Sequence, residues 1–397
     1  MSILLLPVIL GIMFGTFTGL IPGVHINLIS TLIISSYAKI SGYFSNIEIA
    51  IFIISMSITH TFIDAIPSIY LGAPGESQAL TALPGHKMLL KGQGHFALKL
   101  TVVGSFFTLL CCILFFAMFL RLMNLMEKIT EGKIGYILIA LIVFVIFSQK
   151  GKIMKSITVF LFSASIGMAV LNISSLNQPL FHMLSGFFGI SLLFDSLSNN
   201  ESIPRQTYSS NMISKQAIKK SVMTSSIAGF FAAFTPGFGT SQTAIIAQKF
   251  YKGTEKSFLI LVGGLNTANM IISLGSFYIL NKARNGSIVA IRDVLESIAM
   301  TELLILISVM IISGSVAAIL TLKISKKFSK IIQKLNYRKT AICVITGIIL
   351  LSLLFDGVIG LLVITTSTSL GIIATKLDVG KNNLMGCLIL PTILYLV

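Results

Sequence analysis

Long runs of apolar residues without a single charge constrain this chain more than any other feature. Residues 100–120 contain no charged side chain, and neither do residues 257–281. Residues 340–375 carry only the charge of Asp356 over a length sufficient for two membrane crossings. Because a helix needs about 20 apolar residues to cross the hydrocarbon core of a bilayer, these runs predict membrane-spanning helices. A transmembrane β-barrel would instead show alternating strands of about ten residues.

Composition places the rest of the chain in the same class. Hydrophobic residues make up 55% of the chain and charged residues 11%, whereas soluble domains are roughly a quarter charged. The net charge of +16 lies mainly in short loops between apolar runs, as expected for loops that stay on the cytoplasmic side of a membrane. We therefore predict an all-α polytopic protein of a prokaryotic cell membrane, with membrane lipid but no nucleic acid among its partners.

The apolar runs form two series of eight, which predict two structural repeats. Residues 15–23 (GTFTGLIPG) are echoed by residues 229–237 (GFFAAFTPG), 214 positions later. The predicted first repeat comprises residues 1–197 and the second comprises residues 219–397, with residues 198–218 as a polar linker.

The charges of equivalent loops predict how the two repeats are related. Residues 323–339 carry seven basic residues and no acid, whereas residues 121–133 carry three basic and two acidic residues. Equivalent loops of opposite charge bias belong on opposite sides of the membrane. We therefore predict inverted repeats with about 10–14 membrane segments, including broken or re-entrant helices.

Three Pro-Gly pairs interrupt the apolar runs, and polar residues follow each of them. Proline and glycine open the helical backbone, and the N-terminus of the next helix offers free N–H groups to an anion. Helix breaks at matching positions of two halves predict the substrate and ion site of a secondary transporter, while the alternative is a set of simple kinks. The residues concerned are Pro22, Gly23, His25 and Asn27, then Pro74, Gly75, Glu76, Ser77 and Gln78, and finally Pro236, Gly237, Thr240, Ser241 and Gln242.

Polar side chains within the apolar runs are further candidates for this site. His60 and Asp64 lie four residues apart on one helix face and can form a proton or cation site. Asn266 and Asn269 lie in a fully uncharged run. For all four residues the alternative is a structural polar contact between packed helices.

Several other residues are predicted to have structural roles only. We interpret Asp356 as an isolated acid in a turn between two spans, and His182 as a packing or interfacial histidine. The four cysteines lack metal-ligand spacing, and the motifs of metalloproteases, serine hydrolases, Walker-type ATPases and dinucleotide-binding enzymes do not occur. The predictions are therefore no catalytic residues, no metal site and no cofactor other than a coupling ion, Na⁺ or H⁺.

The chain resembles the TctA family, the membrane permease subunit of tripartite tricarboxylate transporters, and its archaeal branch in particular. The similarity covers nearly the whole chain. The resemblance rests on residues 15–27 (GTFTGLIPGVHIN), 59–99 (with LGAPGESQALTALPGHKMLLKGQG), 236–248 and 384–396 (LMGCLILPTILYL).

This resemblance implies a two-repeat permease for carboxylate anions, driven by an ion gradient. It also implies two partners, an extracytoplasmic binding protein and a small membrane subunit. The family pattern has small residues after the second Pro-Gly pair, where this chain carries Glu76, Ser77 and Gln78, and an acid there disfavours a tricarboxylate.

We therefore predict a secondary active transporter for a small organic anion, most simply a carboxylate. The alternative is a translocase for polyprenyl phosphate or another lipid phosphate. In that case the phosphate would be captured by the basic cluster of His86, Lys87, Lys91, His95 and Lys99. An intramembrane enzyme that uses His60 and Asp64 is the least favoured class.

Overall fold

The computed structural model describes residues 2–21, 30, 33–34, 37, 41–72, 82–130, 133–147, 152–198, 204–207, 213–234, 240–251, 253–283, 285–333 and 337–396. These parts of the chain are helical apart from short connections, so the prediction of an all-α polytopic protein is confirmed for them.

The helices of the first half run from the N-terminal region to residue 198. They are α1 (Ser2–Leu20), α4 (Asn46–Ile63), α5 (Ala65–Leu71), α6 (Ala82–Leu90), α7 (Gly94–Leu114), α8 (Phe116–Thr130), α9 (Ile134–Phe147), α10 (Ile153–Leu171), α11 (Pro179–Leu184), the π-helical turn η1 (Ser185–Ile190) and α12 (Ser191–Ser198).

The helices of the second half follow the residues predicted as the linker. They are α13 (Lys215–Phe234), α14 (Thr240–Phe250), α15 (Glu255–Leu280), α16 (Gly286–Leu295), α17 (Met300–Ile332), α18 (Tyr337–Lys376), the 3₁₀ turn η2 (Lys381–Met385) and α19 (Gly386–Leu396).

Helix α18 is broken in its middle. Asp356 and Gly357 leave the helical region, and Gly357 has a φ of +57°, a conformation that costs glycine little and other residues more. The break makes two helical arms of about 20 residues each, enough for each arm to span a bilayer. The expected turn at Asp356 therefore has its physical basis in Gly357.

Six helical segments of the described chain are long and apolar enough to cross a membrane. They are Asn46–Leu71, Gly94–Leu114, Ile153–Leu171, Glu255–Leu280, Met300–Ile332 and Arg338–Lys376. Shorter apolar helices cover Leu4–Leu20, Pro179–Asp195 and Asn383–Tyr395. The number of crossings that the short helices add stays a prediction.

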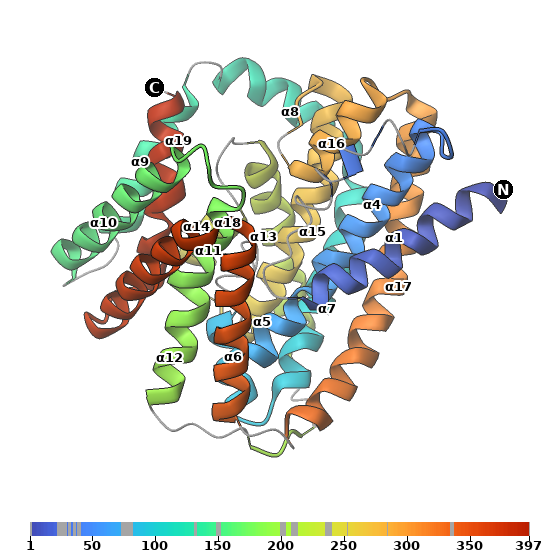
Figure 1. Cartoon of the computed structure of the whole chain (residues 1–397). Helices are drawn as coiled ribbons and strands as arrows, with labels where there is room; N and C mark the ends of the chain where they lie inside the picture. Colours follow the sequence, from blue (N-terminus) through green and yellow to red (C-terminus); the bar gives the residue numbers. More distant parts are fainter. Residues whose placement is uncertain are drawn as a thin grey trace.

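The helices pack into two bundles with separate hydrophobic cores, and each bundle takes helices from both halves of the chain. Bundle 1 contains α1, α4–α8 and α13–α17. Bundle 2 contains α9–α12, α18 and α19, and these helices lie together on the left of Figure 1. Helix α14 joins the two bundles, because it packs on α13 and α15 and also contacts η2 of bundle 2.

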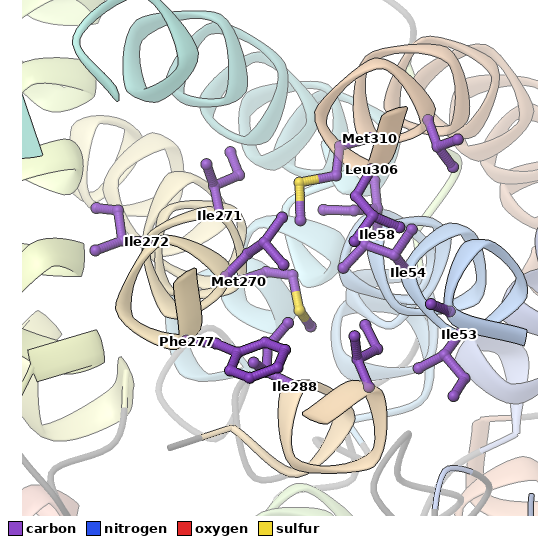
Figure 2. Close-up of a cluster of buried hydrophobic side chains, with 14 of the residues drawn as sticks. Ile53, Ile54, Ile58, Met270, Ile271, Ile272, Phe277, Ile288, Leu306 and Met310 are labelled. Carbon is purple, nitrogen blue, oxygen red and sulfur yellow. The ribbon is translucent and has the colours of Figure 1, made fainter. Parts of the chain in front are cut away.

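Helices α4 and α15 occupy the centre of bundle 1. In the most apolar 18 residues of each segment, 94% of the positions are buried for α4 with α5 and 89% for α15, whereas only 39% are buried for α17. Figure 2 shows how the two helices meet α16 and α17 through large apolar side chains. The labelled residues are Ile53, Ile54, Ile58, Met270, Ile271, Ile272, Phe277, Ile288, Leu306 and Met310.

The packing of bundle 1 follows one pattern in both halves. Helix α4 lies against α1 and α17, and α15 lies against α13 and α7. Gly15 of α1 lies so close to α4 that a Cβ would come within 2.8 Å of Thr59, and Gly229 of α13 is in similarly close contact with Ala268 of α15. Small residues allow this close approach of membrane helices. The predicted sequence echo thus coincides with equivalent helix contacts.

Bundle 2 shows the same kind of correspondence at the level of single residues. Gly386 of α19 packs on Ser163 of α10, and Gly186 of η1 packs on Ser367 of α18, about 200 residues away. In both pairs an added Cβ would lie 2.6 Å from the serine side chain.

Two further glycines of bundle 2 also form a matching pair. Gly167 of α10 contacts the backbone of Cys387, and Gly371 of α18 contacts the backbone of Phe187. Helix α10 of the first half therefore packs on α19, which ends the second half. Helix α18 of the second half packs on η1, near the end of the first half. The division into two repeats stays a prediction.

The relative direction of α7 and α17 bears on the inversion of the repeats. His95, near the start of α7, bonds to Ser325, near the end of α17, while Leu109, near the end of α7, touches Gly314 in the middle of α17. The two helices, which the predicted repeats would place at equivalent positions, therefore run antiparallel. An inverted pair of repeats requires this arrangement.

Candidate functional site

Most of the residues predicted around the Pro-Gly pairs lie outside the described residues. They are Pro22, Gly23, His25, Asn27, Pro74, Gly75, Glu76, Ser77, Gln78, Pro236 and Gly237. Ser241 and Gln242 lie in α14, but the structure does not describe their side chains. Thr240 begins α14 and is buried. The role of these residues stays a prediction.

His60 and Asp64 lie in the last turn of α4 and at its junction with α5. His60 Nδ1 is 3.0 Å from Thr18 Oγ1 of α1, and both side chains are buried. The N–H of Asp64 donates to the carbonyl oxygen of His60 at 2.9 Å, so the two residues do lie on successive turns. The junction between α4 and α5 therefore concentrates polar groups in the most deeply buried helix of bundle 1.

Asn266 has a buried amide group without a hydrogen-bond partner. The residue is 4% exposed, and within the described chain neither its Nδ2 nor its Oδ1 finds a partner. Asn269, one turn later, accepts a long bond of 3.5 Å from Ser273. A buried amide that is left unsatisfied costs about 1–3 kcal/mol, so Asn266 is a candidate for contact with a ligand.

Thr59 on α4 also has a buried polar atom. Its hydroxyl oxygen Oγ1 has no hydrogen-bond partner in the parts of the chain that the structure describes. Thr59 and Asn266 belong to the two helices at the centre of bundle 1, which contact each other. The structure thus leaves an unsatisfied polar side chain in each central helix.

The sequence did not predict a cluster of polar contacts in bundle 2, at the break in the middle of α18. His182 Nε2 donates to Asp356 Oδ2 at 2.6 Å, and both side chains have no exposed surface. The backbone N–H groups of Asn177 and Gln178 donate to the two oxygens of Asp356, at 2.5 and 2.9 Å. The amide Nδ2 of Asn177 also donates to Oδ1 at 3.0 Å. The carboxylate at the break of α18 is thus saturated with donors.

The second ring nitrogen of His182 completes a three-residue chain. His182 Nδ1 lies 2.9 Å from Ser352 Oγ, one turn before Asp356 on α18. Serine, histidine and aspartate are the residue types of a hydrolase triad. Ser352 and His182 are fully buried, and these contacts connect α11 with the break of α18.

These contacts correct one interpretation made from sequence and extend another. Asp356 is not an isolated acid, and His182 is the hydrogen-bond partner of that acid as well as a packed residue. The two residues are 174 positions apart, and only the packing of α11 on α18 brings them together. The signal available in the sequence was an acid next to glycine within a long apolar run, because intramembrane ionisable groups are normally paired.

Lys381 is a second polar residue that the sequence reasoning did not select. It lies in η2, is 8% exposed, and donates from Nζ to Ser191 Oγ at 2.9 Å. Burial lowers the pKa of Lys381 to about 8, although the charge of Asp195 acts in the opposite direction. A lysine in such surroundings is unusual, because lysines are almost never fully buried unless they are paired.

The residues of the basic cluster predicted to bind a lipid phosphate do not form one surface in the structure. His86 is buried, with Nδ1 3.0 Å from the carbonyl oxygen of Ile69, and His95 bonds to Ser325. The lysines of the cluster, Lys87, Lys91 and Lys99, are exposed. The two histidines therefore take part in helix packing rather than in one basic surface.

Among the described residues, no group of three His, Cys, Asp or Glu side chains is placed to hold a metal ion. The site that remains consists of neutral polar groups in α4 and α15, the polar contacts at the break of α18, and the buried Lys381.

Comparison with known proteins agrees with this description. The family model of the tripartite tricarboxylate transporter TctA family matches residues 5–386. A protein of Methanocaldococcus jannaschii, described as uncharacterized, is 32% identical over 403 aligned positions that cover 98% of both chains. No solved structure matches the chain significantly. The chain therefore belongs to the TctA family of tripartite tricarboxylate transporters and is a permease-type, multi-pass membrane protein.

Proposed function

We propose that this protein is a secondary active transporter for a small organic anion, most simply a carboxylate, driven by a gradient of H⁺ or Na⁺. The observation that carries the proposal is the buried amide of Asn266 in a central helix of bundle 1, for which the described residues supply no hydrogen-bond partner. An amide offers both donors and an acceptor, so it can contact a carboxylate or contribute an oxygen to a cation.

The arrangement of the helices supports transport rather than a static scaffold. Each half supplies helices to both bundles, and the matched glycine contacts relate the halves. Such a molecule can adopt two arrangements of nearly equal energy. When two similar halves exchange their conformations, a form open to one side of the membrane becomes the form open to the other side. We propose residues 1–197 and 219–397 as the two inverted repeats.

Polar groups of the central helices would serve substrate and ion. Thr59, His60 and Asp64 belong to α4 and its end, and Asn266 and Asn269 belong to α15. The residues next to the three Pro-Gly pairs are proposed to complete the site. The acid Glu76 disfavours a tricarboxylate, so a mono- or dicarboxylate is the preferred substrate class.

Family membership also suggests partners. We propose that an extracytoplasmic binding protein delivers the anion and that a small membrane subunit accompanies this chain, as the tripartite organisation of the family implies. The cell membrane of a prokaryote is the proposed location.

Asn266→Leu tests the proposal, because function and stability should change in opposite directions. Removing an unsatisfied buried amide should leave the ligand-free protein as stable as before, or more stable by about 1–3 kcal/mol. Carboxylate binding and uptake should nevertheless be lost. The measurements are thermal unfolding of the purified protein with acetate, succinate or citrate, with Na⁺ and pH varied, and uptake into proteoliposomes.

Asn172→Leu is the matched control, since Asn172 is exposed at the end of α10 and bonds only locally to Met168. It should bind and transport as the unmodified protein does. Uptake that survives Asn266→Leu would refute the site. Stabilisation by a polyprenyl phosphate but by no carboxylate would favour the lipid-phosphate translocase instead.

A further inference from the structure

Lys381 places a positive charge inside bundle 2 without a carboxylate to neutralise it. The ammonium group has one hydrogen bond, to the hydroxyl of Ser191, and within the described chain no acid lies at ion-pair distance from it. Asp195, one helical turn beyond Ser191, is exposed and acts on Lys381 only through its charge. Two of the three donors of the ammonium therefore remain for another group.

Neighbouring hydroxyl groups are also left unsatisfied. Ser367 Oγ and Thr368 Oγ1 of α18 are buried, and neither has a partner in the parts of the chain that the structure describes. Ser367 lies one turn before Gly371, and Gly371 packs directly on Ser191. One turn of helix is about 5.4 Å, so Ser367 lies about one helical turn along α18 from the residue that packs on Ser191.

The local backbone is irregular at this place. Ser191 follows η1, which is a π-helical segment, and Lys381 belongs to a 3₁₀ turn between α18 and α19. π-helical segments are frequent at functional sites. The π-helical segment before Ser191 and the 3₁₀ turn that carries Lys381 distinguish this region from the regular helix packing around it.

The position of η2 connects this charge with the rest of the candidate site. Helix α14 contacts η2 and also packs on α15, the helix that carries Asn266. Thr240, the first residue of α14, is a buried polar residue that follows a Pro-Gly pair. Lys381 therefore lies where bundle 2 meets the helix that begins at a predicted substrate-binding break.

We propose that Lys381 is an anion-binding residue whose ammonium group, held by Ser191, takes a carboxylate of the transported substrate where η2 meets α14. This inference rests on the proposed transport function and adds to it the residue that supplies the positive charge. A buried ion is costly without a counter-charge, and an incoming carboxylate removes that cost. The ligand class is a small carboxylate.

The lowered pKa of Lys381 is consistent with this role. With a pKa of about 8, the ammonium group keeps its charge at neutral pH while it lacks the partner that would stabilise it. Binding of a carboxylate favours the charged form and raises the pKa again.

The test compares Lys381→Met with Lys152→Met in the full-length protein. Lys152 is exposed and pairs with Asp378 at the surface of the same bundle, so it matches Lys381 in residue type and bundle but not in burial. Acetate, succinate and citrate serve as probes, with inorganic phosphate as an anion without a carboxylate. Affinity is measured from ligand-dependent shifts in melting temperature and from uptake into proteoliposomes.

Lys381→Met should weaken carboxylate binding about 30-fold or more, because the truncation removes a buried charged partner. Lys152→Met should leave the affinity unchanged. Ser191→Ala should weaken binding less, because the ammonium group remains. The ligand-free Lys381→Met protein should melt no lower than the unmodified protein, because the substitution removes a buried charge.

The outcomes separate the two proposals. If the unmodified protein binds carboxylates and Lys381→Met binds them equally well, Lys381 is not the anion residue and the transport proposal stands. If Lys381→Met melts well below the unmodified protein, Lys381 has a structural role and the inference is overturned. If no carboxylate binds the unmodified protein, both the transport proposal and the inference fail. Equal binding of phosphate would overturn the carboxylate class.

Discussion

Two turns of bundle 2, which the proposed repeats would place at equivalent positions, are held in different ways. At the break of α18, Asp356 accepts bonds from Gln178 and His182, and its side chain is fully buried. About 200 residues earlier, Lys152 at the start of α10 pairs with Asp378, and these side chains are 41% and 89% exposed. Each turn is thus bonded to a loop of the other half. The contacts of Asp356 lie in the interior, and the Lys152–Asp378 pair is in contact with solvent.

The difference indicates that burial, rather than the presence of an ion pair, decides how much such a contact contributes to the free energy of unfolding. A buried charge that loses its partner remains in a low-dielectric medium, and this loss costs several kcal/mol. Exposed ion pairs are screened by water and salt, and many contribute nothing measurable. We therefore expect the buried contacts of Asp356 to be stronger than the exposed Lys152–Asp378 pair.

Asp356→Ala should have the largest effect. It removes the acceptor for several donors, among them His182 and two backbone N–H groups. We expect a loss of about 3–5 kcal/mol in the free energy of unfolding, the typical result of breaking a buried pair. Denaturant unfolding in detergent micelles measures it. Asp378→Ala is the matched control, and equal losses in the two variants would remove the contrast.

His182→Leu should have a smaller effect than Asp356→Ala. The carboxylate of Asp356 keeps its bonds from Asn177 and Gln178 and loses one donor. A hydrogen bond to a charged group contributes about 1.5–3 kcal/mol, so a loss in that range is expected. A loss as large as that of Asp356→Ala would mean that the histidine, not the backbone N–H groups, stabilises the acid.

Gly167→Ala and Gly371→Ala test whether the halves are equivalent. At both positions an added Cβ would collide with the backbone of a facing helix, at Cys387 and at Phe187. Overpacking of this kind costs about 1–3 kcal/mol, and both variants should lose a similar amount of thermal stability. Gly347→Ala is the control, because nothing lies within 4 Å of its added Cβ. A loss in one member of the pair alone would contradict the equivalence.

Lys152→Ala should have the smallest effect, and that effect should depend on pH and salt. The hydrogen bond and the charge of Lys152 lower the pKa of Asp378. The pair therefore contributes only above the unfolded-state pKa of Asp378, about 3.9, and its contribution is lost as pH falls through the lower folded-state value. Melting temperatures of the two proteins should be nearly equal at neutral pH and should converge in acid or high salt. A gap that widens in acid would show the opposite sign of coupling.

The sequence predicted the helical segments well because membrane helices are specified locally. The uncharged run 257–281 became α15, and the run 100–120 became parts of α7 and α8. The helix order in the two halves also follows the predicted series. Single residues were harder to predict, because a buried polar group is recognised only by what surrounds it. Asn266 and Asp356 are both polar residues in apolar runs, yet one lacks a partner and the other has several.

The amino-acid sequence by itself determined that the chain is a polytopic helical membrane protein with recurring small-residue and Pro-Gly patterns, since apolarity and backbone propensity act over a few helical turns. Only the tertiary structure decided that helices of both halves share each bundle, that His182 meets Asp356, and that Lys381 is buried beside Ser191. These contacts join residues that are 174 and 190 positions apart. They arise from the way helices pack, which no short stretch of sequence specifies.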